Sequence, residues 1–249
     1  MDIGIYDLNM CSNLTYKERL MVYKNEGFEK LGLYIDDAYM SNGEKYEDII
    51  NYAKQIGMMV NQVHVDYKIS NDICDNLQSY ISYVKSRLDI CEKYKIKNMV
   101  LHASKGDNPP LVNEAAVNAI VELAKDFSEI NLCFENVRNN SNLSKLLAVD
   151  CDNICMCYDM GHENCYSQED LIKLYANKIK CAHLHNNRGQ DSHNLISDGD
   201  IDYKNKISKL KDIKDCDMCL EVFPPKGAVL TKSEFITFVK KAMAEIKDL

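Results

Sequence analysis

The stretch that decides the fold runs from Ile154 to His185 and reads ICMCYDMGHENCYSQEDLIKLYANKIKCAHLH. It begins with an apolar run at Ile154–Asp159, continues through a helix-period segment at Gln168–Ala176, and ends with a second apolar run at Ile179–His185. Short apolar runs of this kind predict buried strands. A strand, a helix and a strand within roughly 30 residues predict one βαβ unit, with parallel strands and a right-handed crossover.

The same alternation extends over the whole chain and makes eight strand–helix units. The other strands are predicted at Asp2–Leu8, Lys30–Ile35, Met58–Val65, Lys97–His102, Asn131–Val137 and Asp217–Val222. The other helices are predicted at Thr15–Asn25, Lys45–Ile56, Asp72–Tyr94, Asn113–Ser128, Leu143–Val149, Tyr203–Leu210 and Lys232–Ile246. Eight units in 249 residues predict a single (β/α)8 TIM barrel, with one domain over residues 1–249. A doubly wound open sheet is the alternative, but it would place a glycine-rich turn after its first strand, and residues 8–12 (LNMCS) contain no glycine.

The composition is that of a globular protein, with 46% hydrophobic and 27% charged residues and a formal net charge of -8. No basic tract is present, so the bulk charge predicts neither a nucleic-acid partner nor an anionic membrane. No apolar run approaches the length of a membrane span, and the first residues do not resemble a signal peptide. The 11 cysteines lie in apolar segments, which favours a reduced, cytoplasmic protein over a disulfide framework. The lone CxxC at Cys216 and Cys219 is interpreted as part of the packed core.

Side chains that carry chemistry gather at the ends of the predicted strands and in the loops just after them. The set contains all six histidines and four acids: His64, His102, His162, His183, His185, His193, Glu135, Asp159, Asp191 and Glu221. In a (β/α)8 barrel these ends converge on one face, and such ligands suit divalent metal ions. A lone histidine there is more often a hydrogen-bonded core residue, and Glu135 or Glu221 alone could pair with Arg138 or Lys226. However, three acids within apolar strands are costly to bury unless a shared cation neutralises them.

Four short motifs resemble those of the xylose isomerase-like, or AP endonuclease family 2, barrels. They are Phe134-Glu135-Asn136, Asp159-x-x-His162, His183-x-His185 and Glu221. The stretch from His183 to Asp202 (HLHNNRGQDSHNLISDGDID) is similar to the sugar phosphate isomerase/epimerase branch, where HxH is followed by DxH, a glycine-containing turn and Ile-Asp. The resemblance covers nearly the whole chain.

The resemblance implies an enzyme that binds one divalent ion, Mn²⁺ or Zn²⁺, with Co²⁺ and Mg²⁺ as further candidates. The implied ligands are Glu135, Asp159, His185 and Glu221. The two glutamates are the implied catalytic residues, because in such epimerases one removes a proton next to a carbonyl and the other returns one through an enediolate. His183 is interpreted as structural, because it lies on the same side of its strand as His185 and the barrel interior has limited room.

The implied substrate is a small sugar, sugar phosphate or polyol-derived ketone. The candidate substrate-binding residues are His64, His102, His162 and Arg188, although Arg188 could equally be a solvated loop residue. Tryptophan is absent, so an aromatic wall over a sugar would come from Tyr6 or Phe223. Ketose epimerases usually carry a further glutamate after the one at Glu135, and this chain has residues 136–138 (NVR) there, which leaves the sugar open.

An endonuclease IV-type zinc enzyme that cleaves abasic DNA is the main alternative. Its extra ligands correspond here to His64, His102, His162, Asp191 and His193. The short loops and the lack of a basic or aromatic insertion disfavour a duplex partner, so we expect a small-molecule substrate and neither a nucleic-acid nor a membrane partner. A binding or regulatory relative without catalysis is a third alternative, and a homo-oligomer remains open.

Overall fold

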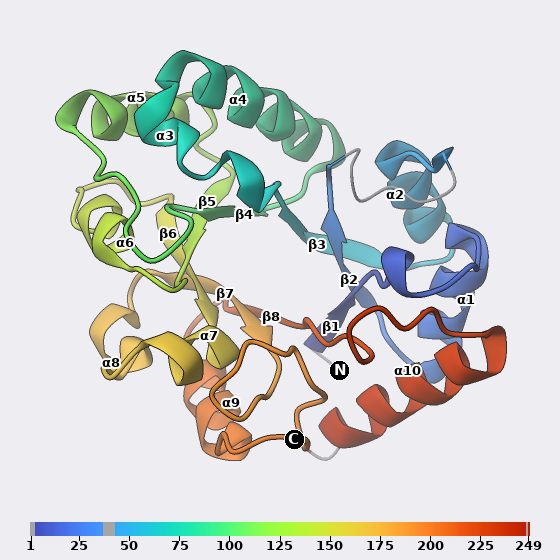
Figure 1. The fold of residues 1–249 in the computed structure, drawn as a ribbon. Helices are drawn as coiled ribbons and strands as arrows, with labels where there is room; N and C mark the ends of the chain where they lie inside the picture. Colours follow the sequence, from blue (N-terminus) through green and yellow to red (C-terminus); the bar gives the residue numbers. More distant parts are fainter. Residues whose placement is uncertain (1–2, 37–42, 248) are drawn as a thin grey trace.

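The structure is a computed structural model that describes residues 3–36, 43–247 and 249. Eight parallel strands form a closed barrel in sequence order, and β1 also pairs with β8 to close it (Figure 1). The strands are β1 (Ile3–Tyr6), β2 (Lys30–Tyr34), β3 (Met59–His64), β4 (Asn98–His102), β5 (Asn131–Glu135), β6 (Ile154–Asp159), β7 (Ile179–Leu184) and β8 (Asp217–Leu220). The single (β/α)8 barrel predicted from the sequence is therefore confirmed. Asp2, where the first strand was predicted to begin, lies outside the described residues.

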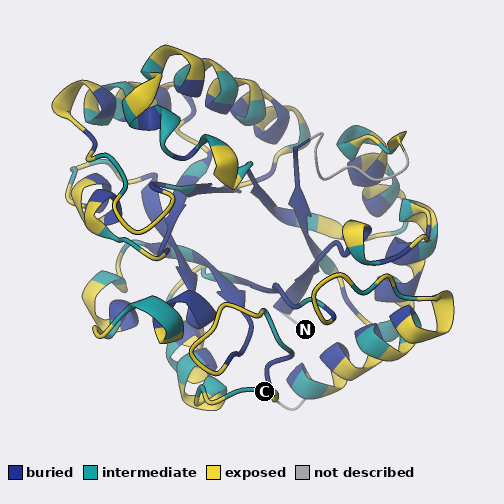
Figure 2. Cartoon of the chain, viewed as in Figure 1, coloured by how far each residue is buried: buried dark blue, intermediate teal, exposed yellow. Residues whose placement is uncertain are grey.

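Helices surround the barrel and bury one face each against it, while their outer faces are exposed (Figure 2). They are α1 (Tyr16–Glu26), α2 (Tyr46–Gln55), α3 (Asp72–Asp75), α4 (Leu77–Tyr94), α5 (Glu114–Asp126), α6 (Ser141–Leu147), α7 (Met160–Tyr166), α8 (Leu171–Tyr175), α9 (Tyr203–Lys211) and α10 (Lys232–Ile246), with short 3₁₀ turns at Asn9–Cys11 and Tyr67–Ile69. None of the helices in the described part of the chain is long and apolar enough to cross a membrane.

Two segments differ from the sequence prediction. The helix expected over Asp72–Tyr94 is interrupted at Asn76, whose non-helical backbone (φ -150°, ψ 64°) separates α3 from α4. The helix α7 follows directly after β6 and was not predicted, because the sequence MGHENCY has no apolar period. Asp159 begins α7 by accepting a hydrogen bond from the backbone N–H of His162.

The first strand leads into a buried ion-pair group outside the barrel. Arg19 on α1 is fully buried, and its guanidinium donates to both carboxylate oxygens of Asp7 at 2.9 Å and to Oε2 of Glu44 at 2.8 Å. Its Nη1 donates to the carbonyl oxygen of Leu14 and to Oε1 of Glu44. Bidentate pairing of this kind compensates for the burial of the charges and ties β1 to α1.

Thiols fill part of the barrel interior. Cys133, Cys155, Cys157 and Cys181, from β5, β6 and β7, form a buried cluster with Val100. All 11 cysteines of the chain are free, and Cys219 of the CxxC is fully buried in the core. This agrees with the interpretation of the cysteines as small hydrophobic residues.

Candidate metal centre

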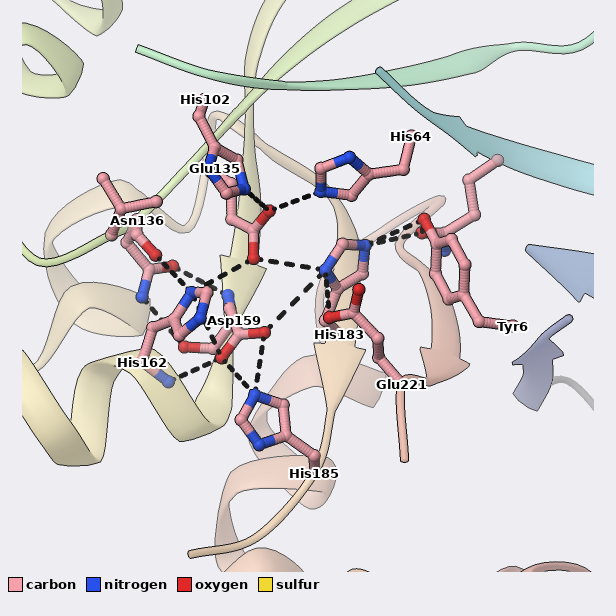
Figure 3. A network of polar contacts seen from close by, with 12 residues as sticks. Tyr6, His64, His102, Glu135, Asn136, Asp159, His162, His183, His185 and Glu221 are labelled. Atoms are coloured by element: carbon pink, nitrogen blue, oxygen red, sulfur yellow. Dashed lines mark hydrogen bonds and ion pairs between the residues drawn. The ribbon is translucent and has the colours of Figure 1, made fainter. Parts of the chain in front are cut away.

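Four side chains converge at the carboxyl ends of neighbouring strands and form what we term the deep group: Glu135, Asp159, His183 and Glu221. Each offers one ligand atom, these atoms all lie within 4.8 Å of one another, and all four residues are buried. Nδ1 of His183 lies 3.3 Å from Oε1 of Glu135 and 3.1 Å from Oε2 of Glu221 (Figure 3). Oδ2 of Asp159 lies 3.8 Å from the same nitrogen, so three carboxylates surround one imidazole nitrogen.

The other ring nitrogen of His183 is held by hydrogen bonds below the deep group. Nε2 lies 3.1 Å from Oε1 of Gln62 and 3.0 Å from the hydroxyl of Tyr6. Gln62 donates from its Nε2 to the carbonyl of Asp217, which directs Oε1 toward His183, and the hydroxyl of Tyr6 donates to that same Oε1. These contacts favour a proton on Nε2 of His183, so Nδ1 is the nitrogen left for a second proton or for a metal. Three carboxylates around Nδ1 favour a positive charge at this point, so the donor set fits a cation that would replace the Nδ1 proton.

A second cluster, the outer group, consists of His162, His185, Asp191 and His193, whose ligand atoms also lie within 4.8 Å of one another. Asp191 links two of the histidines, with Oδ2 3.3 Å from Nε2 of His162 and Oδ1 3.2 Å from Nε2 of His193. The rings of His185 and His193 are stacked with centroids 3.8 Å apart. Nδ1 of His185 is buried and lacks a hydrogen-bond partner among the described residues, which also fits a metal ligand.

The backbone around the outer group is adapted to this packing. Gly161, at the start of α7, lies against the ring of His185, where a methyl group would approach Cε1 to 1.9 Å. His193 has a positive φ of 48°, which is uncommon for a residue other than glycine. Gly199, in the DGD turn, leaves room for the side chain of Asn186, which accepts hydrogen bonds from the backbone of residues 187 and 201. The loop after β7 is thereby folded back over the barrel.

A third cluster contains His64, His102 and Glu135. Oε2 of Glu135 lies 3.1 Å from Nε2 of His64 and 2.9 Å from Nε2 of His102. Because Oε1 of Glu135 faces His183, this carboxylate connects the third cluster to the deep group. A carboxylate placed between two ligand clusters can bridge two cations.

The carboxylates and histidines of the centre change one another's pKa values. Burial would raise the pKa of Glu135, but the charges of His183 and His102 outweigh burial and hold this pKa well below its usual range. Burial would likewise raise the pKa of Glu221, and mainly His183 lowers it. The pKa of His183 is raised well above its ordinary value, because Glu221 and Glu135 outweigh the effect of burial. Burial lowers the pKa of His185. Both glutamates are therefore ionised near neutral pH.

The structure brings the predicted ligands together but changes the place of one. His183, and not His185, lies with Glu135, Asp159 and Glu221. The two histidines share a side of β7, but His183 lies within the strand and is paired in register with Asp159. His185 lies beyond the end of the strand and belongs to the outer group, but its Nε2 also contacts Oδ1 of Asp159 at 3.0 Å. The geometry therefore makes His183 a candidate ligand of the deep group, although the sequence interpretation had given it a structural role.

Three other expectations have different outcomes. His64, His102 and His162 belong to the candidate ligand clusters, and their role in substrate binding stays a prediction. Arg188 is exposed and its guanidinium pairs with Asp198 at 2.8 Å, so it lies on the surface of the loop. Phe223 borders the outer group, with its ring 5.1 Å from that of His193.

The structure also adds residues that sequence reasoning did not single out. The hydroxyl of Tyr34, at the end of β2, donates to Oε1 of Glu221 at 2.5 Å. Tyr6, considered as a wall over a sugar, is instead fully buried below His183 together with Gln62. The alternation of side chains along β3 places Gln62 on the same side as His64, so this signal was present in the sequence.

A closed parallel barrel with carboxylates and histidines at the carboxyl ends of its strands defines a TIM-barrel protein with a candidate metal centre. Residues 24–238 match the family model described as xylose isomerase-like TIM barrel, so the chain belongs to this family.

Comparison with individual proteins agrees with this assignment. The chain is 29% identical over 151 residues to the uncharacterized protein MJ1311 of Methanocaldococcus jannaschii, a match that covers 53% of this chain and only 51% of that relative. It resembles the structure of D-psicose 3-epimerase from Clostridium cellulolyticum H10 with a TM-score of 0.76, 14% identity and coverage of 100% and 99% of the two chains. It also resembles the IolI protein with a bound zinc atom, with a TM-score of 0.77, 17% identity and coverage of 98% and 97%. At these identities the structural likeness establishes the fold.

Proposed function

We propose that the protein is a metal-dependent isomerase or epimerase of a small sugar, sugar phosphate or polyol-derived ketone. The observation that carries the proposal is the placement of Glu135 and Glu221. One oxygen of each carboxylate faces the same nitrogen of His183, and the other oxygen of each is hydrogen-bonded away from that point. Two buried, ionised carboxylates that approach one point from different strands can act on the two faces of a substrate carbon.

The proposed ligands of one divalent ion are the deep group. Mixed carboxylate and imidazole donors suit Mn²⁺ and Zn²⁺, with Co²⁺ and Mg²⁺ as further candidates. Such an ion would supply Lewis-acid polarisation of a carbonyl oxygen. Epimerase and zinc-bound structures among the similar folds support this proposal by analogy of fold.

The proton transfer is assigned to the glutamates. One carboxylate removes the proton from the carbon next to the carbonyl and later releases it to solvent. The other glutamate first takes up a proton from water and then gives it to the opposite face of the resulting enediolate, which leaves both groups ionised again. The hydroxyl of Tyr34 donates to Oε1 of Glu221, which stabilises the ionised form of this carboxylate and orients it. We assign the contact with substrate hydroxyls to His162, and its position beside Glu135, with Nδ1 3.2 Å from Oε1, supports this role.

The experiment is a screen of ketoses and ketose phosphates with Mn²⁺-loaded protein in D2O. We expect solvent deuterium at the carbon next to the carbonyl, and a loss of roughly 10²-fold or more in turnover for Glu135→Gln and Glu221→Gln. Glu122→Gln is the matched control, because Glu122 is an exposed acid on α5. Turnover without label would refute proton transfer and indicate a hydride shift.

A zinc-dependent phosphodiester hydrolase acting on abasic DNA is the second candidate, favoured by one observation. The outer group and the third cluster provide ligands for further cations beside the deep group. Metal analysis separates the two candidates, since one ion per chain favours sugar chemistry and three favour hydrolysis. Chelator-sensitive cleavage of an oligonucleotide with an abasic site, together with an inactive sugar screen, would establish the hydrolase.

The cysteines support a proposal about the cellular setting. With all 11 thiols free, we propose that the chain works in a reducing compartment such as the cytoplasm, as one domain acting on a small molecule.

A further inference from the structure

A cavity of about 1210 Å³ lies at the end of the barrel opposite the candidate metal centre. Its lining includes the first residues of several strands, among them Ile3, Lys30, Asn98, Asn131 and Asp217. The metal-centre residues lie at the last residues of the strands or beyond them, so the two sites are separated by the length of the barrel. This face of a TIM barrel normally serves stability, and a large polar cavity there therefore calls for a specific explanation.

The charge of the cavity is opposite to that of the chain. Its lining contains five lysines (Lys30, Lys97, Lys180, Lys211 and Lys247) and two aspartates (Asp215 and Asp217), whereas the whole chain carries a net charge of -8. Asp217 is already neutralised, because Oδ1 accepts from Nζ of Lys30 at 2.8 Å and Oδ2 accepts from the amide of Asn98 at 3.1 Å. The remaining lysines thus leave an excess of positive charge.

Some of this charge has an ordinary structural role. Lys211 and Lys247 lie at the ends of α9 and α10, where cations stabilise the last turn of a helix, and Lys211 contacts the backbone oxygen of Leu249. Lys97 and Lys180 differ, because Lys97 directly precedes β4 and Lys180 lies within β7. Neither has a carboxylate partner within 4.0 Å in the part of the chain that the structure describes, and Lys180 is half-buried.

We propose that this cavity binds a small polyvalent anion of the phosphate type, held by Lys97 and Lys180. The exposed Lys97 and the half-buried Lys180 line the same cavity without a carboxylate partner, and a multiply charged phosphate would supply the missing negative charge and accept hydrogen bonds from both ammonium groups. The residues that line the cavity favour an anion over a cation, because the carboxylate of Asp217 is already paired with Lys30. The site is independent of the function proposed for the other end of the barrel.

The test is a calorimetric titration of the full-length, EDTA-treated protein with inorganic pyrophosphate. Removal of divalent ions prevents pyrophosphate from binding through a metal at the candidate metal centre, where carboxylates without a metal ion repel anions. We expect saturable binding by the wild-type protein and an at least tenfold weaker affinity for the double variant Lys97→Gln/Lys180→Gln. Lys125→Gln/Lys173→Gln is the matched control, because it removes the same charge from exposed positions on α5 and α8 outside the cavity lining.

Each outcome decides the proposal. Wild-type protein that shows no saturable binding at millimolar pyrophosphate would overturn it, as would equal weakening in the control variant. Citrate, titrated in parallel, distinguishes phosphate recognition from charge alone, and equally tight citrate binding would refute the phosphate specificity. Unchanged melting temperatures of both double variants establish that a loss of binding does not reflect unfolding.

Discussion

The contact between Gly161 and His185 makes the substitution Gly161→Ala a sharp test of the outer group. Glycine within a helix is destabilising by roughly 0.5–1 kcal/mol relative to alanine, so by helix propensity alone this substitution would stabilise α7. The structure reverses this expectation. The added methyl group would lie 1.9 Å from Cε1 of His185, whereas ordinary contacts begin at 3.4 Å, so the ring must retreat by about 1.5 Å.

A retreat of this size is incompatible with metal binding by the outer group. Ligand distances in metal sites are held to within about 0.2 Å, so His185 would leave the coordination sphere. The deep group does not contain His185 and should be retained. If the outer group holds an ion besides that of the deep group, as the hydrolase alternative requires, Gly161→Ala should lose this ion, while the ion of the deep group stays bound.

The assay is metal analysis of zinc-loaded protein after removal of free ions, combined with thermal melting. Cys165→Ala is the control, because Cys165 lies on the same helix and outside all the ligand clusters. Zinc content and melting temperature equal to those of the wild type in Gly161→Ala would refute the assignment of His185 as a ligand.

Three further predictions concern other parts of the molecule. Gln62→Ala removes the hydrogen-bond acceptor that orients the ring of His183, so the metal affinity should fall by roughly 10–100-fold. A competition titration with a chelating dye measures this affinity, and an unchanged value would contradict the orienting role of Gln62. Burial would lower the pKa of His193, but neighbouring carboxylates raise this pKa to about 9, so a metal ion must displace a proton from the imidazole. If one proton is released, the metal affinity should rise about tenfold between pH 7 and pH 8. A metal affinity that does not depend on pH would contradict the assignment of His193 as a ligand. Arg19→Met leaves the carboxylate of Asp7 buried without its partner and should lower the free energy of unfolding by about 3–5 kcal/mol in urea denaturation, whereas a loss below 1 kcal/mol would show that the pair is dispensable.

The sequence was sufficient to predict the barrel because its strands are short apolar runs that differ clearly from the helix-period segments between them. The boundaries were less accurate, since the first strand was expected to extend to Leu8 and ends at Tyr6. The break at Asn76 was missed because the apolar period continues across it, and only the backbone conformation reveals the interruption.

The candidate centre was predictable as a set of residues but not as separate groups. The alternation of side chains shows that His183 and His185 share one side of β7, yet depth within the barrel decides which of them meets Glu135. That depth depends on the register between β6 and β7, which a single sequence does not contain. Contacts across the barrel, such as Tyr34 with Glu221, connect residues 187 positions apart and could not be predicted from local patterns.

The thiols below the deep group bear on the metal preference proposed for it. Burial raises the pKa values of Cys133, Cys157 and Cys181 well above the ordinary range, so these side chains stay protonated and uncharged. Only a thiolate is a strong ligand for soft metals, and a protonated thiol is a poor nucleophile as well. A chain with 11 cysteines thus keeps an oxygen- and nitrogen-lined centre free of competition from sulfur, and its interior cysteines resist oxidation and alkylation for the same reason.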